Sequence, residues 1–541
     1  MRRQRITSML SGLALTAGAL LGGAGTAAAD GPPAEFGTDW HDPVTAAPPV
    51  ARPAGPSCRV TLAAAQFRDF TPYEGSYTPP AACGPGDWSA VVLRLDGQVK
   101  GRQYDRLGHL SVGGVEILRT STPEPSPDGI TWSVEKDVTR YRDTLRRPQP
   151  VEMLIGNVVD DTYTGVIDVT VTLDFYPARA GTGGTGGPGR RTPARGVPDR
   201  VLPLGPGTVT TPRNTERVLA EVYATGSGGG CEEFWYLTVP DGAPYSCKAT
   251  DGPYREVQVS VDGRLAGIAA PFPHVWTGGW SNPFLWYVVP APRAFDVQPV
   301  VYDLTPFAAL LNDGRPHAVT VSVAGVPAGQ SGWSTPANLL LWQDEGRRVV
   351  TGALTRAEAG PLTGSSVHTP GTPHRLDTRG GHRLTTSGYL DTSHGRVTTT
   401  VTRTLAHTSV HRWTEDENQD ALAATWTDRE SVTTGRTTTR TDRTYTLDGA
   451  VTLGADGRLR TVITMGDRAD GTVLRDGRRL AWSRLDDRYT GDASYTSGVP
   501  RDQRHAVGTS TERYRLTGPT GCYDREIGTE QGVLTVDRHN C

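Results

Sequence analysis

An aspartate–arginine pair within residues 99–112 is the first group in this chain that could do chemistry. Asp105 and Arg106 are adjacent, and the apolar and polar residues around them indicate a strand on either side. A carboxylate can take a proton from water, and a neighbouring guanidinium can hold that carboxylate or donate to a substrate. Since the two side chains of a regular strand would point to opposite faces, we expect a bulge or a strand end here.

A second group lies far along the chain, in residues 230–236. Glu232 and Glu233 follow Cys231 and precede Phe234 and Trp235. Acids beside rings, together with the Asp105 run, favour a hydrolase of a polar, sugar-bearing substrate. Only the fold can bring the two groups together.

The bulk properties of the chain narrow its class. Its 541 residues predict two to four domains. The net charge of -3 argues against a nucleic-acid surface and a polybasic membrane patch. Abundant glycine (65) and proline (41), with only 4 methionines, favour short strands and turns over helices.

The N-terminus is typical of a secretory signal. A basic start at residues 1–5 precedes a short apolar stretch at 10–23, and small residues end at Ala29. The stretch is short for a membrane anchor and rich in glycine and alanine. We therefore expect cleavage near Ala29 and an extracellular protein without a membrane partner.

Export makes disulfides the expected state of the six cysteines. No Cys-x-x-Cys occurs, which counts against a redox pair or a structural zinc site. Fifteen pairings are possible, and the simplest closes each cysteine on its neighbour in sequence. That choice pairs Cys58 with Cys83, Cys231 with Cys247, and Cys522 with Cys541.

The pattern along the chain predicts an all-β protein. Residues 166–175 alternate strictly, 256–265 read as a hairpin with an Asp-Gly turn, and 91–97 read as a strand that ends in a turn. Further strands are expected at 318–323, 398–404 and 450–461, and short helices at 302–311 and 137–141. The predicted layout is a leader at 30–57, β-sandwich domains at 58–177 and 201–345, a Gly/Pro-rich linker at 178–200, and a Thr/Arg-rich β domain at 346–541.

Several long motifs carry a resemblance to a known family. Residues 111–137, 154–165, 271–279 and 337–342 resemble, in the same order, the peptide-N-glycanase A family, the peptide-N4-(N-acetyl-β-glucosaminyl)asparagine amidases A. The resemblance covers roughly 58–345. The family is similar, at a greater distance, to flavobacterial peptide-N-glycanases, which implies two jelly-roll-like β-sandwich domains side by side with the site at their interface, followed here by the C-terminal β-rich domain.

The resemblance implies roles for individual residues. Asp105 matches the catalytic aspartate and would activate water, and Glu233 matches the glutamate of the second domain and would position the reacting group or protonate the leaving nitrogen. Arg106 would bind the substrate. A third acidic position of the wider family falls on Asn157, so its role passes to the amide or to Asp160 or Asp161.

Four tryptophans are candidates for stacking on sugar rings: Trp132, Trp235, Trp276 and Trp280. Trp276 and Trp280 stand among glycines and prolines, where surface loops form. Core packing is an equal alternative for Trp132 and Trp235.

Other chemistries find little support. The Gly-x-Gly-x-x-Gly match within 181–189 has no helix pattern after it, which counts against a nucleotide site. The Gly-x-Ser-x-Gly motif of α/β-hydrolases and the metal-binding His-Glu-x-x-His motif do not occur. We therefore expect no cofactor and no metal. The implied partners are N-glycosylated peptides or unfolded glycoproteins, acted on by a monomer. The alternatives are a lectin or adhesin on the same fold, and an endo-β-N-acetylglucosaminidase with two carboxylates about a glycosidic bond.

Overall fold

The computed structural model describes residues 44–84, 86–103, 105–123, 129–178, 196–226, 230–273, 292–330, 332–496, 505–519, 521–530 and 533–541. Strands make up most of these residues, and the helices are single turns, as the all-β expectation requires. Among the described residues, no helix is both long and apolar enough to cross a membrane.

The first block of the chain forms two four-stranded antiparallel sheets that share one core. One sheet has the order β1 (Cys58–Phe67), β8 (Val166–Pro177), β3 (Trp88–Lys100) and β6 (Ile130–Asp137). The other has the order β2 (Tyr73–Tyr77), β7 (Gln149–Ile155), β4 (Leu107–Val112) and β5 (Val115–Ser121). Short turns of helix, η2 (Ala81–Cys83), η3 (Thr139–Tyr141) and α3 (Arg142–Leu145), connect them.

The alternation predicted for 166–175 is confirmed in β8. Ile167, Val169, Val171, Leu173 and Phe175 are all buried in the shared core. A strand with every second side chain apolar buries one face, and that face here meets the other sheet.

The predicted turn at the end of 91–97 is wrong. Strand β3 continues through Asp96 and Gly97 to Lys100. The glycine is there because of packing: a Cβ at Gly97 would lie 2.3 Å from Cζ2 of Trp132 on β6. The Asp-Gly pair therefore marks a close contact within a strand.

The second block contains three smaller sheets. One has the order β14 (Val300–Asp303), β10 (Thr215–Val222), β17 (Ala337–Gln343) and β9 (Arg200–Leu204), and another has β13 (Arg264–Ala269), β12 (Glu256–Val261) and β15 (Val319–Ala324). A two-stranded ribbon joins β11 (Thr225–Gly226) to β16 (Trp333–Ser334). The described residues of the block also form the short helices η4 (Trp235–Leu237), α4 (Pro292–Phe295), η5 (Thr305–Phe307) and α5 (Ala308–Leu311).

The hairpin expected at 256–265 and the short helices expected at 302–311 and 137–141 are confirmed. Asp262 and Gly263, both with positive φ, form the two-residue turn between β12 and β13, as an Asp-Gly turn should. The helix expected at 302–311 appears as η5 and α5, and the one at 137–141 as η3.

The C-terminal third is one long antiparallel meander. Its strands are β18 (Thr351–Ala359), β19 (Thr363–Thr369), β20 (His374–Thr392), β21 (Gly395–Trp413), β22 (Gln419–Thr434), β23 (Thr437–Leu453), β24 (Leu459–Arg475), β25 (Arg478–Tyr495), β26 (His505–Gly518), β27 (Gly521–Glu530) and β28 (Val533–His539). The stretch 450–461, expected as strand, covers the end of β23, a turn and the start of β24.

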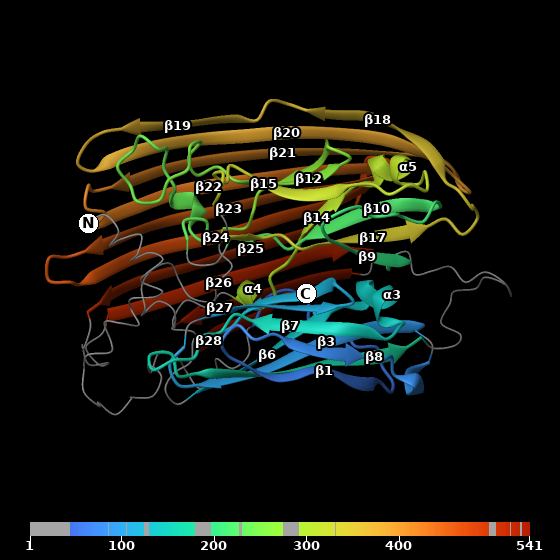
Figure 1. Ribbon diagram of the computed structural model, residues 1–541, viewed down its shortest axis with the longest axis horizontal. Coiled ribbons are helices and arrows are strands. Elements are labelled where there is room, and N and C mark those ends of the chain that lie inside the picture. The colour runs from blue at the N-terminus through green and yellow to red at the C-terminus, as the bar shows by residue number, and fades with distance from the viewer. Residues whose placement is uncertain are drawn as a thin grey trace.

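The three parts pack against one another. The long sheet runs along the whole molecule, with the second block in front of it and the first block beside its last strands (Figure 1). One apolar cluster includes Trp235 and Tyr236 of the second block together with Leu405 and Trp426 of the sheet. The segment before β1 also contacts the sheet, because the Ala46 amide donates to Glu512.

The three predicted disulfides are confirmed: Cys58–Cys83, Cys231–Cys247 and Cys522–Cys541. The predicted signal sequence and most of the Gly/Pro-rich linker lie outside the described residues, as do Trp276 and Trp280.

Candidate functional site

Asp105 and Arg106 lie in the loop between β3 and β4, directly before β4 begins at Leu107. The expected strand end is therefore present. Both residues are half-buried. The Arg106 amide donates to Thr122 Oγ1 (2.8 Å), and the Thr122 amide donates to the Arg106 carbonyl (2.9 Å). These bonds tie the loop to the end of β5.

The Arg106 guanidinium has partners close to it in sequence and in space. Its Nε donates to Gln103 Oε1 (2.9 Å), and its carbon lies 5.6 Å from the centre of the Tyr163 ring. Gln103 in turn donates to the carbonyls of Val158 and Gly165, each at 2.9 Å. The arginine is thus held in a fixed orientation beside Asp105.

Glu233 lies in a tight turn of the second block. Its amide donates to the Gly230 carbonyl at 3.0 Å, and its side chain is half-buried. Burial raises the pKa of the neighbouring Tyr236 phenol, and the negative charge of Glu233 raises it further. The phenol therefore stays protonated beside the carboxylate. The Cys231–Cys247 disulfide holds the turn from one side.

Glu232, the residue before Glu233, lies in the interior. It is 1% exposed and forms a two-pronged ion pair with the equally buried Arg255. The paired distances are 2.8 Å from Nε to Oε2 and 2.6 Å from Nη2 to Oε1. Adjacent glutamates thus have opposite environments, and only Glu233 has access to solvent.

Arg119 of β5 joins the two blocks. This buried guanidinium pairs with Glu116 at 2.7 Å, and it donates to Thr225 Oγ1 (2.6 Å) and Ser334 Oγ (3.0 Å) of the β11–β16 ribbon. Strand β5 is buried along its whole length because the second block covers its outer side.

The position of Arg119 relates the two candidate acids. On the first block, its strand ends beside the Arg106 loop, since Leu107 pairs with Ser121. On the second block, the ribbon it contacts abuts the glutamate turn: a Cβ at Gly226 would lie 2.3 Å from the Glu232 carbonyl oxygen. This contact between β5 and the ribbon is the junction of the two blocks, and it is connected to the loop of Asp105 on one side and to the turn of Glu233 on the other.

Two titratable groups at this junction have shifted pKa values. Burial, helped by the charge of Arg119, lowers the pKa of His109 to about 4, so its ring is neutral at physiological pH. Burial raises the pKa of Glu116, although the charge of Arg119 opposes that shift.

Three residues predicted to bind substrate lie in the interior instead. Trp132 and Trp235 are 3% and 2% exposed and belong to apolar clusters. Asn157 is fully buried, and its amide nitrogen donates to the carbonyls of Phe67 (2.9 Å) and Gly165 (3.0 Å). Neighbouring sheets and loops cover almost all of these three side chains.

The two aspartates that follow Asn157 are exposed. Asp160 accepts bonds from the amides of Thr162 and Tyr163, each at 2.7 Å, and so closes a turn.

Sequence reasoning missed Glu116, Arg119 and Arg255. A signal existed for the first two: the run Val115-Glu-Ile-Leu-Arg119 places two ionisable residues in a strand that is otherwise apolar. Such residues are rarely buried unless they pair.

One group of three possible metal ligands occurs in the described part of the chain, at Glu216, Asp344 and His394. Asp344 already accepts bonds from the Ser393 amide and hydroxyl, each at 2.6 Å, and from the Gly346 amide at 2.9 Å. These bonds fasten the β20–β21 hairpin to the second block.

Comparisons with known proteins agree on one family. A family model described as "Peptide N-acetyl-beta-D-glucosaminyl asparaginase amidase A" matches residues 43–360. A curated relative from Prunus dulcis, peptide-N4-(N-acetyl-beta-glucosaminyl)asparagine amidase A, is 34% identical over 359 residues, which are 61% of this chain and 61% of that protein. This chain thus matches less than two thirds of the relative's length.

Solved structures are more distant. PNGase F, a glycosylasparaginase from Flavobacterium meningosepticum, has 13% identity and a TM-score of 0.35, over 53% of this chain and 96% of that one. PNGF-II has 15% identity and a TM-score of 0.35, over 53% and 66% of the two chains. Likenesses at this TM-score are too weak to support an inference about the fold.

Proposed function

Because this chain belongs to the peptide N-acetyl-beta-D-glucosaminyl asparaginase amidase A family, we propose that it hydrolyses the side-chain amide linking an N-glycan to asparagine. The peptide keeps an aspartate, and the glycan leaves intact as a glycosylamine that later loses ammonia. The substrates are N-glycosylated peptides or unfolded glycoproteins. Support comes from the family match, which covers both blocks that meet at the junction.

The chemistry needs a base and a second polar group on the other side of the amide. An amide carbon is a poor electrophile, so attacking water must be deprotonated and the leaving nitrogen protonated. We assign the first task to Asp105 and the second, or the positioning of the reacting group, to Glu233. Arg106 orients Asp105 or donates to the substrate from its fixed place beside the Tyr163 ring.

One observation carries this assignment. Asp105 and Glu233 belong to different blocks and both are half-buried. Strand β5, which carries Arg119, ends beside the loop of Asp105, and Arg119 donates to the ribbon that abuts the turn of Glu233. Residues that keep partial access to solvent beside a buried junction are what a substrate bound between two blocks would meet.

Several related features belong to the same proposal. The two blocks are jelly rolls, Trp276 and Trp280 stack on sugar rings, and the protein acts as a secreted monomer at 30–541. The three disulfides support secretion, since such bonds persist in oxidising compartments.

The test is mass spectrometry of a defined N-glycopeptide after incubation with the protein and its D105N variant. The unaltered protein should release intact glycan and leave a peptide with Asn converted to Asp. The rate of D105N should be lower by about 10²–10⁴-fold or more. The control is E152Q, which changes an exposed acid of β7 and should keep full activity.

Other products would assign another function. A peptide that keeps one N-acetylglucosamine would indicate the endoglycosidase. Retention on a glycopeptide column without any turnover would indicate the lectin. Equal rates for D105N and the unaltered protein would remove Asp105 from the mechanism.

A further inference from the structure

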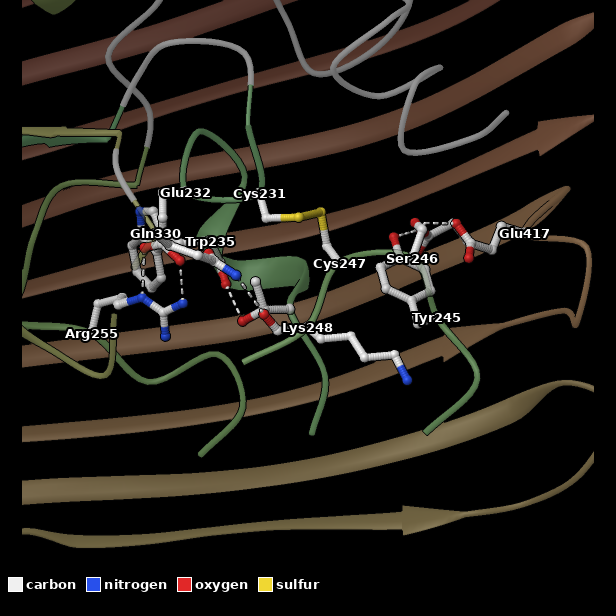
Figure 2. The surroundings of a disulfide bond; sticks show 12 residues. Cys231, Glu232, Trp235, Tyr245, Ser246, Cys247, Lys248, Arg255, Gln330 and Glu417 are labelled. Carbon is white, nitrogen blue, oxygen red and sulfur yellow. Dashed lines mark hydrogen bonds and ion pairs between the residues drawn. A yellow bond between two sulfur atoms is a disulfide. The ribbon is translucent and has the colours of Figure 1, made fainter. Parts of the chain in front are cut away.

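The ion pair of Glu232 and Arg255 is buried and held in place by several hydrogen bonds. Both side chains are fully buried and joined by two short bonds (Figure 2). Arg255 Nη1 also donates to the carbonyls of Gly252 (2.9 Å) and Tyr254 (3.0 Å). Trp333 Nε1 donates to Glu232 Oε2 at 2.6 Å. Three of these bonds reach the Glu232 carboxylate and hold it in one arrangement.

This glutamate is connected to the first block through the β11–β16 ribbon. Trp333 is paired with Gly226 in the β11–β16 ribbon, and its neighbour Ser334 accepts a bond from Arg119. A series of polar contacts, buried at Arg119 and Glu232 and half-buried at the ribbon, therefore runs from the first block to Glu232. Glu233 follows Glu232 directly, and its amide is bonded within the same turn.

Burying such a pair is a poor way to gain stability. Removing two charges from water costs several kcal/mol, and apolar residues of similar volume often stabilise a protein equally well or better. What the pair supplies is a defined geometry, since the planar guanidinium donates two parallel hydrogen bonds to the two oxygens of the carboxylate. A function that depends on where Glu233 points would use that property.

We infer that the Glu232–Arg255 pair is a positioning pair that sets the Glu233 carboxylate against Asp105 across the junction. This inference rests on the proposed amidase function. Neither residue of the pair touches the substrate, since both are covered by protein. The pair acts through the backbone of the turn, which the Cys231–Cys247 disulfide holds from its other side (Figure 2).

The first test measures kcat and KM on an N-glycopeptide for E232Q, R255K and W333F. A displacement of about 1 Å at a reacting group can cost ~10²-fold. We expect kcat to fall by about 10- to 100-fold in E232Q and R255K, with KM changed less than about 3-fold. W333F keeps an aromatic ring and loses one donor, so it should fold and show a smaller fall in kcat.

A matched control separates positioning from stability. D428N breaks another buried two-pronged pair, Arg403–Asp428, within the long sheet, and should leave kcat unchanged in the folded fraction. The triple variant E232L/R255M/W333F replaces the polar group by apolar side chains. We expect its melting temperature to recover relative to E232Q while kcat stays low.

Three outcomes would overturn the inference. They are an unchanged kcat in W333F and E232Q, a kcat restored together with stability in the triple variant, and a loss in D428N equal to that in E232Q. Failure of the proposed function would look different: the unaltered protein itself would release no glycan, and both proposals would fall together.

Discussion

At the scale of single residues, sequence neighbours can have opposite surroundings. Glu232 is sealed in an ion pair while Glu233 keeps access to solvent, although their side chains are chemically identical. The difference comes from Arg255 and Trp333, which lie 23 and 101 positions away. A residue's role in this protein therefore depends on which distant group faces it.

His109 supplies a prediction on pH. Its folded pKa of about 4 lies below the ordinary value of 6.5, so the unfolded chain binds the proton first as the pH falls. The contribution of the neutral ring to the free energy of unfolding is fully present above about pH 6.5 and is lost as the pH falls toward 4. The loss is about 3 kcal/mol at most.

Urea unfolding at pH 7.5 and pH 4.5 checks this. The H109Q variant should lose less stability between the two pH values than the unaltered protein. H539Q, which changes an exposed histidine, should behave as the unaltered protein does. An identical pH dependence in H109Q would contradict the expectation.

At the scale of elements, one glycine lets two strands pack as they do. Gly97 of β3 leaves room for the Trp132 ring of β6, and a methyl group there would overlap it. The turn predicted at this point is absent because the strand pairs with β8 from Trp88 to Lys100 and with β6 from Val92 to Val99.

The G97A variant should be destabilised by about 1–3 kcal/mol, since overpacking forces neighbouring side chains to shift. The matched control is G364A on β19, where a Cβ would meet nothing within 4 Å. Thermal melting of both proteins tests this. A melting temperature in G97A equal to that in G364A would show that the ring moves aside freely.

Three neighbouring strands of the long sheet carry a row of buried acids. Asp467 of β24 is opposite Asp487 of β25, which is opposite Glu512 of β26. Burial, together with the charge of Asp487, raises the pKa of Glu512, and burial also raises that of Asp487. The charges of Arg293 and Arg525 oppose the shift at Glu512.

These raised pKa values predict lower stability in alkali. In the unfolded chain the carboxyl groups of Asp487 and Glu512 lose their protons at about pH 4, whereas the folded protein keeps them to about pH 7 and 8. The free energy of unfolding therefore falls as the pH rises through neutrality. The E512Q variant should lose at least about 1 kcal/mol less than the unaltered protein between pH 6 and pH 9. Guanidinium unfolding at both pH values measures this, and an equal loss in both proteins would refute it.

At the scale of the whole molecule, the long sheet completes the core of the second block. Trp235, Tyr236 and Ile268 are buried against side chains of the sheet, among them Leu405 and Trp426. The glutamate turn rests on this cluster, so the C-terminal third supports the candidate site although it lies outside most of the family match.

A chain ending at residue 345 should therefore fail to form the native second block. We expect it to aggregate or to bind a hydrophobic dye, since the apolar face under the sheet would be exposed. Separately expressed residues 346–541, added during refolding, are the control. A soluble, dye-negative fragment 30–345 with full activity would show that the sheet is dispensable.

Much of this architecture was predictable because it depends on local information. Disulfides closed between cysteines 16 to 25 positions apart, and loop closure favours such short spans. The alternation in β8 and the Asp-Gly hairpin at 262–263 follow from the two-residue period of a strand and from turn geometry. The motifs that carry the family resemblance are likewise contiguous in sequence.

Only the tertiary structure decided which of these residues are inside. Trp132, Asn157 and Trp235 have the side chains of a sugar-binding site, yet each is covered by strands or loops from elsewhere in the chain. Arg119 and Arg255 are of a residue type that is usually exposed, yet both are buried and hydrogen-bonded. Burial is set by what packs on a residue from a distance, and periodicity within one segment holds no record of that partner.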